Sequence, residues 1–201
     1  MKLYTNPASP FCRKIEVLLH EAGQYDAVEK LAAAGHPTDP GTMPVAFNPI
    51  GKIPTLLTDD DKAIFDSRVI ARYLDAEFGT GFYPEDGLFD VLTLEATGDA
   101  ICDAAVLMVY ETRSRAEDKY DPAFFEGQLS KVARALDHLE ARVADLLSGP
   151  LTIGQIAVGC ALGYLDFRHG DRNWREGRPA LTAWFAEFAE RPSMQATKPD
   201  G

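Results

Sequence analysis

The residues Ser9-Pro10-Phe11-Cys12 put a hydroxyl and a thiol where a predicted strand passes into a predicted helix. Ser followed by Pro is a good helix start, with Ser as the N-cap and Pro at the first helical position, and this structural explanation is complete by itself. The position also suits chemistry, because a helix N-terminus stabilises an anion such as a thiolate. The spacing is that of a Cys-x-x-Cys redox motif with a hydroxyl in first place, which could donate to a bound thiolate and lower its pKa. Cys12 could itself be a nucleophile, or an inert residue facing the core.

Two further segments could hold the backbone and one end of a peptide-like ligand. Pro54 precedes a predicted strand, and a cis Ile53–Pro54 bond would leave the Ile53 backbone free to pair with a ligand as an added strand; a plain loop with trans prolines is the alternative. Asp66-Ser67 opens a predicted helix, for which capping is a sufficient explanation. In the functional interpretation, Ser67 binds a carboxylate and Asp66 an ammonium group. Because a free α-amino acid end carries both charges, this pair suits a γ-glutamyl group.

The elements that must position these residues are predicted from hydrophobic periodicity and turn residues. In the first part of the chain we expect a strand, a helix, a second strand, a proline-rich loop, a hairpin and a helix, at 2–5, 11–23, 25–32, 36–48, 54–58 with 63–65, and 66–78. Beyond these the strands disappear, and helices are predicted over 88–117, 121–147, from 152 onward, and 179–190. The chain is therefore predicted to divide into an α+β domain, a linker and an all-helical domain, over 1–78, 79–84 and 85–201.

Composition narrows the class of protein. With 201 residues, 46% hydrophobic and 25% charged, the chain has the make-up of a globular protein. Its net charge of −11 argues against a nucleic-acid binder, which needs a cationic face. Three cysteines without paired spacing predict a reducing compartment, and no apolar run is long enough for a membrane span, so a cytoplasmic protein is expected. The four histidines share no metal-ligand spacing, so no metal is expected.

Four segments of this chain resemble the glutathione transferase superfamily in order and spacing, most closely its bacterial members with a serine in the catalytic position. They are SPFCRKIEVLLHEAG, NPIGKIPTL, FDSRVIARYL and RPALTAWFAEFAERPS, and the resemblance covers nearly the whole chain. It implies a thioredoxin-like N-terminal domain of order β-α-β-α-β-β-α, an all-α C-terminal domain and a homodimer. The implied activity is conjugation of glutathione, as co-substrate, to a small electrophilic apolar substrate, or its use to reduce that substrate. The role would be detoxification, with no tightly bound cofactor.

The resemblance also implies a role for each residue of the first site. Ser9 would be the catalytic residue that activates the glutathione thiol. Ile53 before a cis proline would pair with the cysteinyl backbone of glutathione, Asp66 and Ser67 would hold its γ-glutamyl end, and Lys52 lies where members often contact its glycyl end. The predicted glutathione-binding residues are thus Phe11, Lys52, Ile53, Pro54, Asp66 and Ser67.

Residues predicted for the second substrate and for the partner subunit are less specific. Tyr110 and Arg113, together with Asn6, are predicted to line the second-substrate pocket, and Asp99 or Asp103 to reach the glutathione of the partner subunit. A solvated helix face is the alternative for the residues of the long helix.

The helix predicted from residue 152 begins with a segment that resembles the buried capping box of the family. Thr152 would cap this helix and Gln155 would bond back to the Thr152 amide, although members usually have Asp in place of Gln155. Gly154 in the first turn is expected to cost about 0.5–1 kcal/mol relative to Ala.

Two other functions remain open from the sequence. Fold does not fix function, so a non-catalytic binding or scaffold protein could keep the same segments. A glutathione-dependent thiol reductase working through Cys12 is the other alternative.

Overall fold

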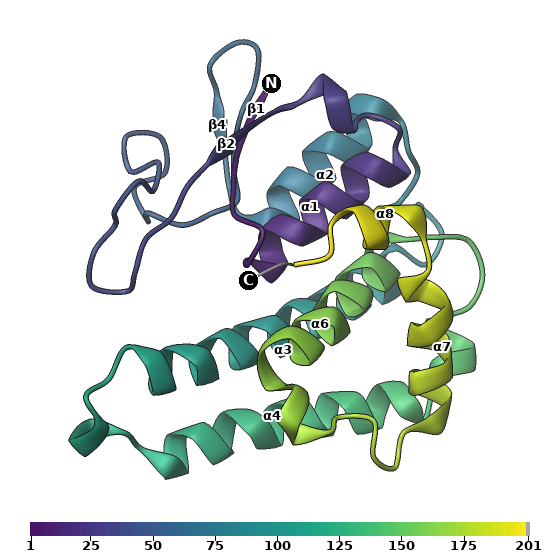
Figure 1. The fold of residues 1–201 in the computed structure, drawn as a ribbon. Helices are drawn as coiled ribbons and strands as arrows, with labels where there is room; N and C mark the ends of the chain where they lie inside the picture. Colours follow the sequence, from purple (N-terminus) through teal and green to yellow (C-terminus); the bar gives the residue numbers. More distant parts are fainter. Residues whose placement is uncertain (200–201) are drawn as a thin grey trace. The chain divides into compact units, whose positions relative to one another are not determined.

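A computed structural model describes residues 1–199 and groups them into two compact units (Figure 1). The first unit is Met1–Leu88 with the segment from Pro192 onward, and the second is Phe89–Arg191. The sequence-based division instead assigns everything after residue 84 to the helical domain. The final segment differs because of its contacts, which are described below.

The first unit contains a four-stranded mixed sheet in the order β2-β1-β3-β4. Its strands are β1 (Lys2–Thr5), β2 (Glu29–Ala32), β3 (Thr55–Leu57) and β4 (Ala63–Ile64). β1 is parallel to β2 and antiparallel to β3, with Tyr4 opposite Thr55, and β3 is antiparallel to β4, with Leu56 opposite Ile64. The C-terminal end of β1, the start of β3 and the end of β4 therefore lie at one end of the sheet.

Two helices of this unit, α1 (Pro10–Glu21) and α2 (Ser67–Phe78), pack side by side (Figure 1). Their apolar faces and the inward residues of the sheet form the core, whose fully buried members include Leu3, Ile15, Leu18, Leu56, Ile70 and Leu74. α2 ends at Gly79, whose φ of +62° is the left-handed conformation that glycine adopts without strain. The predicted strands and helices of this half, including the hairpin, are present, but the second strand is shorter than the predicted 25–32, because Tyr25–Ala27 form a 3₁₀ turn.

Between β2 and β3 the described residues form turns and an isolated bridge between His36 and Asp39, without a helix. The helix that the family resemblance implies here is thus absent from this part of the described chain. Pro37, Pro40 and Pro44 explain the difference, because each lacks an N–H and disfavours a helical conformation of the residue before it.

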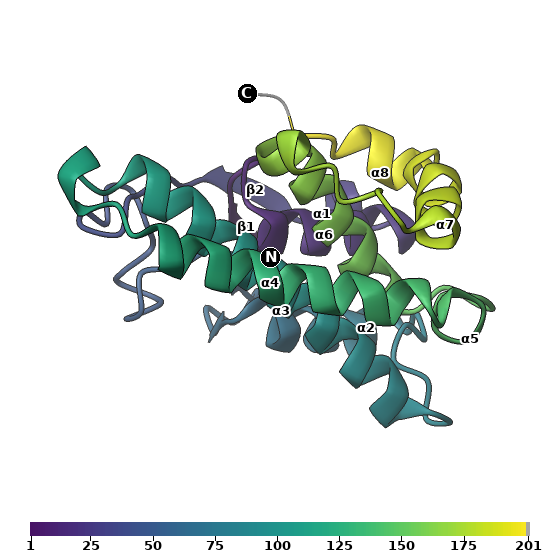
Figure 2. The same ribbon diagram turned by 90° about the horizontal axis from the view of Figure 1, so that it is seen from below.

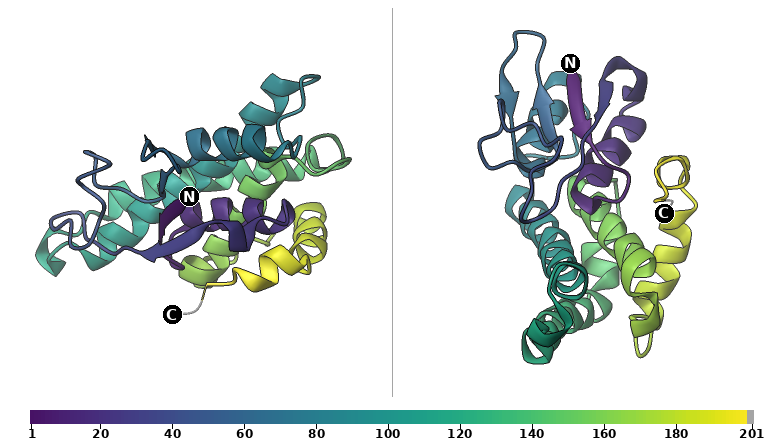
Figure 3. Two further views of the ribbon diagram at one scale, coloured as in Figure 1. Left: turned by 90° about the horizontal axis from the view of Figure 1, so that it is seen from above. Right: turned by 60° about the vertical axis from the view of Figure 1, so that its left-hand side comes forward.

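The segment after Pro192 joins the first unit through α1. Its short helix α8 (Pro192–Ala196) packs on α1 (Figure 3). The buried Arg13 side chain of α1 donates to the Met194 carbonyl at 2.9 Å and to Thr197 Oγ1 at 3.3 Å. These charge-assisted bonds hold the segment on the sheet-containing unit. Periodicity cannot reveal such a long-range contact.

The described residues of the second unit form helices joined by turns and loops, without a strand (Figure 2). Its α-helices are α3 (Leu88–Arg113), α4 (Pro122–Glu140), α5 (Val143–Leu146), α6 (Ile153–His169) and α7 (Pro179–Ala189), with short 3₁₀ turns after α3 and after α6. The single helix predicted over 121–147 is therefore two, α4 and α5. No helix within residues 1–199 is long and apolar enough to cross a membrane.

Glycines set the distance between α3 and α6. A Cβ on Gly98 would come within 2.6 Å of the Ala157 carbonyl carbon, and one on Gly154 within 2.8 Å of the Leu94 side chain. Such distances are shorter than real Cβ contacts, so the helices could not pack this closely with larger residues. The expected local cost of Gly154 is thus accompanied by a packing requirement that helix propensity alone does not reveal.

Candidate functional site

Ser9 is the N-cap of α1, and Pro10 occupies the first helical position. The Ser9 hydroxyl oxygen accepts a hydrogen bond from the Cys12 N–H at 3.3 Å, and the Ser9 N–H donates to the Asn6 carbonyl at 3.0 Å. Asn6 is itself fixed, since its side chain donates to the Ala33 carbonyl at 3.0 Å. Capping uses the Ser9 oxygen as an acceptor, so the hydroxyl proton remains available to an anion at the helix N-terminus.

Cys12 lies one turn into α1 and has no exposed surface. Burial raises the pKa of its thiol to about 11, although hydrogen bonds involving Ser9, Asn6 and Thr5 act in the other direction. The thiol therefore stays protonated near neutral pH, which disfavours Cys12 as a nucleophile. The other two cysteines, Cys102 and Cys160, are also free and buried.

The loop before β3 carries a cis Ile53–Pro54 peptide bond, as the sequence analysis expected. Pro54 is buried, Ile53 is half-buried and Lys52 is exposed. The loop is held by Asn48, a buried residue whose side-chain amide donates to the Lys52 carbonyl at 2.9 Å and whose oxygen accepts from the Ile50 N–H at 3.1 Å.

Sequence reasoning missed this role of Asn48. The signal that could have identified it is the Asn-Pro pair, because Asn side chains often bond to the backbone two residues on. Thr55 closes the same network, since its hydroxyl donates to the Lys52 carbonyl at 2.9 Å.

Asp66 and Ser67 begin α2 as predicted, with Asp66 as the N-cap. The Asp66 carboxylate accepts from the Arg68 N–H at 3.1 Å and from the Arg68 guanidinium at 2.9 Å. Partial burial would raise the pKa of Asp66, but the bonds and charge of Arg68 outweigh burial and lower it. Asp66 is therefore an exposed anion at neutral pH, next to the buried Ser67. The Phe65–Asp66 peptide bond is also cis.

Strand pairing brings the three segments to one end of the sheet. Ser9 follows β1, Ile53 and Pro54 precede β3, and Asp66 follows β4. The strand pairing places the end of β1, the start of β3 and the end of β4 at the same end of the sheet. Phe11 lies in the first turn of α1 and is half-buried. A helix N-terminus with a free hydroxyl proton, an exposed carboxylate and a second helix start can together bind a small zwitterionic peptide. The described residues hold no group of three metal-ligating side chains.

In the second unit, the predicted residues lie along α3. Tyr110 is 40% exposed and Arg113 is the last residue of the helix, where its side chain is exposed. Asp103 is exposed too, whereas Asp99 is only 6% exposed. The solvated-face interpretation is therefore wrong for Asp99. Asn6, predicted for the same pocket, belongs to the first unit.

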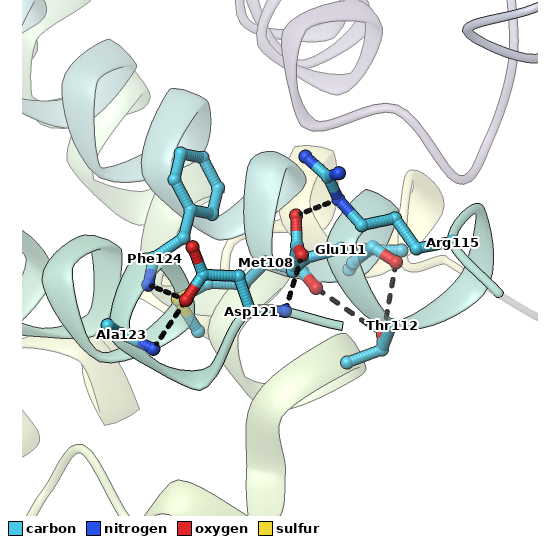
Figure 4. Close-up of polar contacts among 8 residues, drawn as sticks. Met108, Glu111, Thr112, Arg115, Asp121, Ala123 and Phe124 are labelled. Carbon is cyan, nitrogen blue, oxygen red and sulfur yellow. Dashed lines mark hydrogen bonds and ion pairs between the residues drawn. The ribbon is translucent and has the colours of Figure 1, made fainter. Parts of the chain in front are cut away.

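Glu111 fixes the end of α3 (Figure 4). This buried carboxylate accepts from Arg115 Nε at 2.6 Å and from the Asp121 N–H at 3.0 Å. Asp121 in turn caps α4 by accepting from the Ala123 N–H at 3.0 Å. The helix start at residue 121 is predicted from the sequence, whereas the part played by Glu111 is not. Together Glu111 and Asp121 hold the turn next to Tyr110.

Gln155 bonds as the capping-box interpretation predicts. Its side-chain oxygen accepts from the Thr152 N–H at 2.7 Å. Its amide nitrogen donates to the Leu147 carbonyl at 3.1 Å and to the Ser148 carbonyl at 3.2 Å. A carboxylate could not donate these two bonds, so the amide side chain fits the loop that precedes α6 in this chain.

Comparison with known proteins agrees with this architecture. Residues 8–77 match the family model of the glutathione S-transferase N-terminal domain, and residues 122–187 match that of the C-terminal domain. The uncharacterized GST-like protein YibF of Escherichia coli (strain K12) is 33% identical, with 99% of this chain and 98% of that protein covered.

Solved structures give the same class of protein. A glutathione transferase family member from Pseudomonas fluorescens Pf-5 with bound glutathione has a TM-score of 0.96 and 45% identity, covering 100% of this chain and 99% of its own. A structure from the same organism with bound S-(propanoic acid)-glutathione has a TM-score of 0.92 and 45% identity, covering 100% of both chains. The thioredoxin-like sheet unit and the helical unit are thus the fold of glutathione transferases. The chain belongs to the glutathione transferase family.

Proposed function

We propose that this protein is a glutathione transferase that binds glutathione as a thiolate and transfers it to a small electrophile. The observation that carries the proposal is the position of Ser9. It caps α1 with its oxygen, keeps its proton available, and lies at the same end of the sheet as the cis Ile53–Pro54 bond and the start of α2. The 45% identical neighbour with bound glutathione supports the choice of ligand.

Each residue of this end has a proposed task. Ser9 donates a hydrogen bond to the glutathione sulfur, and the partial positive charge of the α1 N-terminus adds to it, so the thiol ionises at lower pH. The Ile53 backbone pairs with the cysteinyl residue, Asp66 meets the α-ammonium group, and Ser67 with its amide holds the α-carboxylate. The exposed Lys52 is placed for the glycyl carboxylate, and Phe11 for an apolar contact.

The chemical step needs the thiolate and a second substrate held close to it. The sulfur attacks an electrophilic carbon, a C–S bond forms, and the leaving group departs with its electron pair. Tyr110, Arg113 and Asn6 are the proposed residues for the second substrate. The S-(propanoic acid)-glutathione held by one neighbour supports a site that accepts a glutathione thioether.

Assembly and location complete the proposal. We propose a homodimer in which Asp99 or Asp103 reaches the glutathione of the partner subunit, and a role in detoxification. Three free cysteines are compatible with a reducing compartment such as the cytoplasm.

The test of the proposed mechanism is Ser9→Ala. The pH at which bound glutathione ionises should rise, conjugation of an aryl halide at neutral pH should fall about 100-fold, and glutathione affinity should stay nearly unchanged. Ser9→Thr retains a hydroxyl and should restore activity. Ser9→Gly costs only a few tenths of a kcal/mol as an N-cap, so it separates loss of the hydroxyl from loss of the cap. An unmoved thiol titration would leave Ser9 as a cap only.

The same proteins and assay distinguish the transferase from a non-catalytic scaffold protein. Retention on a glutathione resin without turnover of any aryl halide would favour a binding protein over an enzyme. Cys12→Ala should leave conjugation intact, since the Cys12 thiol is buried and protonated. Activity that survives Ser9→Ala and is lost in Cys12→Ala would instead support a thiol reductase.

A further inference from the structure

Arg13 is a buried arginine one turn into α1, and neither the binding of glutathione nor the chemical step described above uses it. The residue is 7% exposed. Its N–H donates to the Ser9 carbonyl at 3.0 Å, which closes the first turn of the helix. Residues four apart share one helix face, where their side chains begin about 5–6 Å from each other. A permanent positive charge therefore starts one turn from the hydroxyl proposed to bind the glutathione sulfur.

The acceptors of the Arg13 guanidinium are uncharged. They are the Met194 carbonyl at 2.9 Å and the Thr197 hydroxyl oxygen at 3.3 Å. Within residues 1–199, no carboxylate lies at ion-pair distance from Arg13. The buried Glu111 of the second unit has the usual arrangement, since Arg115 neutralises its charge at 2.6 Å. Arg13 keeps a buried charge that the described part of the chain does not balance.

The segment 192–199 holds this charge beside α1 (Figure 1). At the end of the helix the Ser193 hydroxyl donates to the Glu21 carboxylate, and nearer its start Thr197 accepts from Arg13. The segment therefore runs back along α1 towards the helix N-terminus. Thr197 is fixed in turn, because its hydroxyl donates to the Ser193 carbonyl at 2.8 Å. All of these residues belong to the first unit, together with those proposed to bind glutathione.

The other ionisable side chains around Arg13 do not replace its charge. Those on α1 and on the segment 192–199 are Cys12, Lys14, Glu16, His20, Glu21 and Lys198. Lys14 is the next residue along the chain, so it lies on another side of the helix. Glu16 accepts from the Thr5 hydroxyl. On the neighbouring helix α2, the N-cap carboxylate is paired with the guanidinium two residues further on. Arg13 is therefore the buried cation that shares a side of α1 with Ser9.

We propose that Arg13 supplies a second positive influence on the glutathione thiolate, in addition to the Ser9 hydroxyl, and that the segment 192–199 holds Arg13 in place for this task. The inference rests on the proposed function. Ser9 donates to the sulfur directly, whereas Arg13 acts across one helix turn, so it is a positioning residue and not a catalytic one. Burial strengthens the attraction, because charges interact more strongly where water is excluded. The sulfur of the bound ligand is then the anion that Arg13 lacks.

Anchoring of the segment 192–199 is the competing explanation of Arg13. Two hydrogen bonds from a guanidinium hold a chain segment well, whatever the ligand is. In that case every substitution that breaks these bonds lowers stability, and the charge itself has no effect on glutathione. The deciding measurement is therefore the ionisation of the bound thiol, with and without the charge of Arg13.

The experiment follows the ultraviolet absorbance of the thiolate of glutathione bound to the 201-residue protein while the pH is changed. Arg13→Met removes the charge and keeps an apolar stem, so the pH of half-ionisation should rise by about 0.5–1. Arg13→Lys keeps the charge and should restore most of the wild-type value. S-methylglutathione has no ionisable thiol, so its affinity should change less than about twofold in both variants. If Arg13→Met does not fold, Arg13→Gln carries the same expectation with a hydrogen-bond donor retained.

Two control variants separate charge from anchoring. Thr197→Val removes one acceptor of Arg13 and leaves the charge, so it should lower the melting temperature without changing the thiol titration. Arg72→Met removes an exposed arginine of α2 in the same unit, and it should leave the titration unchanged because solvent and salt screen that charge.

The outcomes separate this inference from the proposed function. The same thiol titration in the wild type and in Arg13→Met would overturn the inference and leave the Ser9 mechanism untouched. An Arg13→Lys or a Thr197→Val protein that titrates like Arg13→Met would also overturn it, because anchoring and not charge would then be the cause. A wild-type protein that binds no glutathione would overturn the inference and the proposed function together.

Discussion

The two units position their functional residues by different physical means. In the first unit, Ser9 and Asp66 are N-caps of α1 and α2. The loop before Pro54 is held by hydrogen bonds from the Asn48 side chain to backbone groups that are close to it in sequence. In the second unit, the positions of residues along α3 depend on how closely α3 approaches α6. Local chemistry builds one region and long-range packing builds the other. The comparison predicts that substitutions in the two regions fail in different ways.

The largest effect is expected from Gly98→Ala in α3. A helix-interior Gly→Ala change would ordinarily stabilise by up to about 1 kcal/mol. Here the new Cβ meets the Ala157 backbone at 2.6 Å, so we expect a loss of about 2–3 kcal/mol in the free energy of unfolding. Urea denaturation measures it.

Gly127→Ala is the matched control for this prediction. Gly127 lies inside α4, and a Cβ there meets nothing within 4 Å. This variant should be neutral or up to about 1 kcal/mol more stable than the wild type. If Gly98→Ala were stabilising to the same extent, close packing of α3 on α6 would not position the second unit's residues.

The next largest effect is expected at Asn48 in the first unit. Asn48 is 2% exposed, and Asn48→Ala leaves the Ile50 N–H without its side-chain partner and the Lys52 carbonyl with only the Thr55 hydroxyl as side-chain donor. The expected loss is about 2 kcal/mol of unfolding free energy, together with weaker glutathione binding, because this loop leads into Ile53–Pro54. Asn48→Asp keeps the acceptor for Ile50 and should bind glutathione better than Asn48→Ala. Lost stability with unchanged glutathione affinity would contradict the role assigned to this loop.

The difference between local hydrogen bonds and long-range packing also explains what could be predicted from the sequence. The Ser9 cap, the hairpin, the helix start at Asp66 and the cis bond before Pro54 all follow from residues close in sequence, and the structure has each of them. Local turn chemistry is visible in a single sequence. The resemblance to glutathione transferases added the ligand to these motifs, and the family comparisons bear out the membership.

Features that depend on distant residues could not be predicted in this way. Arg13 binds the segment after Pro192 across the length of the chain, and no periodicity links the two. His169 of α6 bonds to the Ala105 carbonyl of α3, which is far from it in sequence, so only the packing of α3 on α6 reveals this contact. Gly154 shows the same limit, because helix propensity assigns it a cost where packing requires it.

A smaller effect is expected at the start of α6. Gln155→Glu keeps an acceptor for the Thr152 N–H but removes both bonds donated to the Leu147 and Ser148 carbonyls. We expect a loss of about 1–2 kcal/mol in unfolding free energy at neutral pH. The loss should shrink at pH 4, where a protonated carboxyl can again donate. If Gln155→Glu were as stable as the wild type at both pH values, the hydrogen bonds from Gln155 to these two carbonyls would not contribute to stability.

The smallest effect is a pH dependence carried by His169 in the second unit. Burial lowers the pKa of His169, although its bond to the Ala105 carbonyl acts in the other direction. Its folded pKa is thus below the unfolded value of about 6.5, so the unfolded chain binds more protons in this range. Stability is fully present above pH 6.5 and is lost as the pH falls towards the folded pKa. Unfolding free energies at about pH 7.5 and 5.5 should therefore differ, and His169→Gln should reduce the difference. His138→Gln, at an exposed site, should leave this difference unchanged. An equal pH dependence of the wild type, His169→Gln and His138→Gln would show that His169 does not cause it.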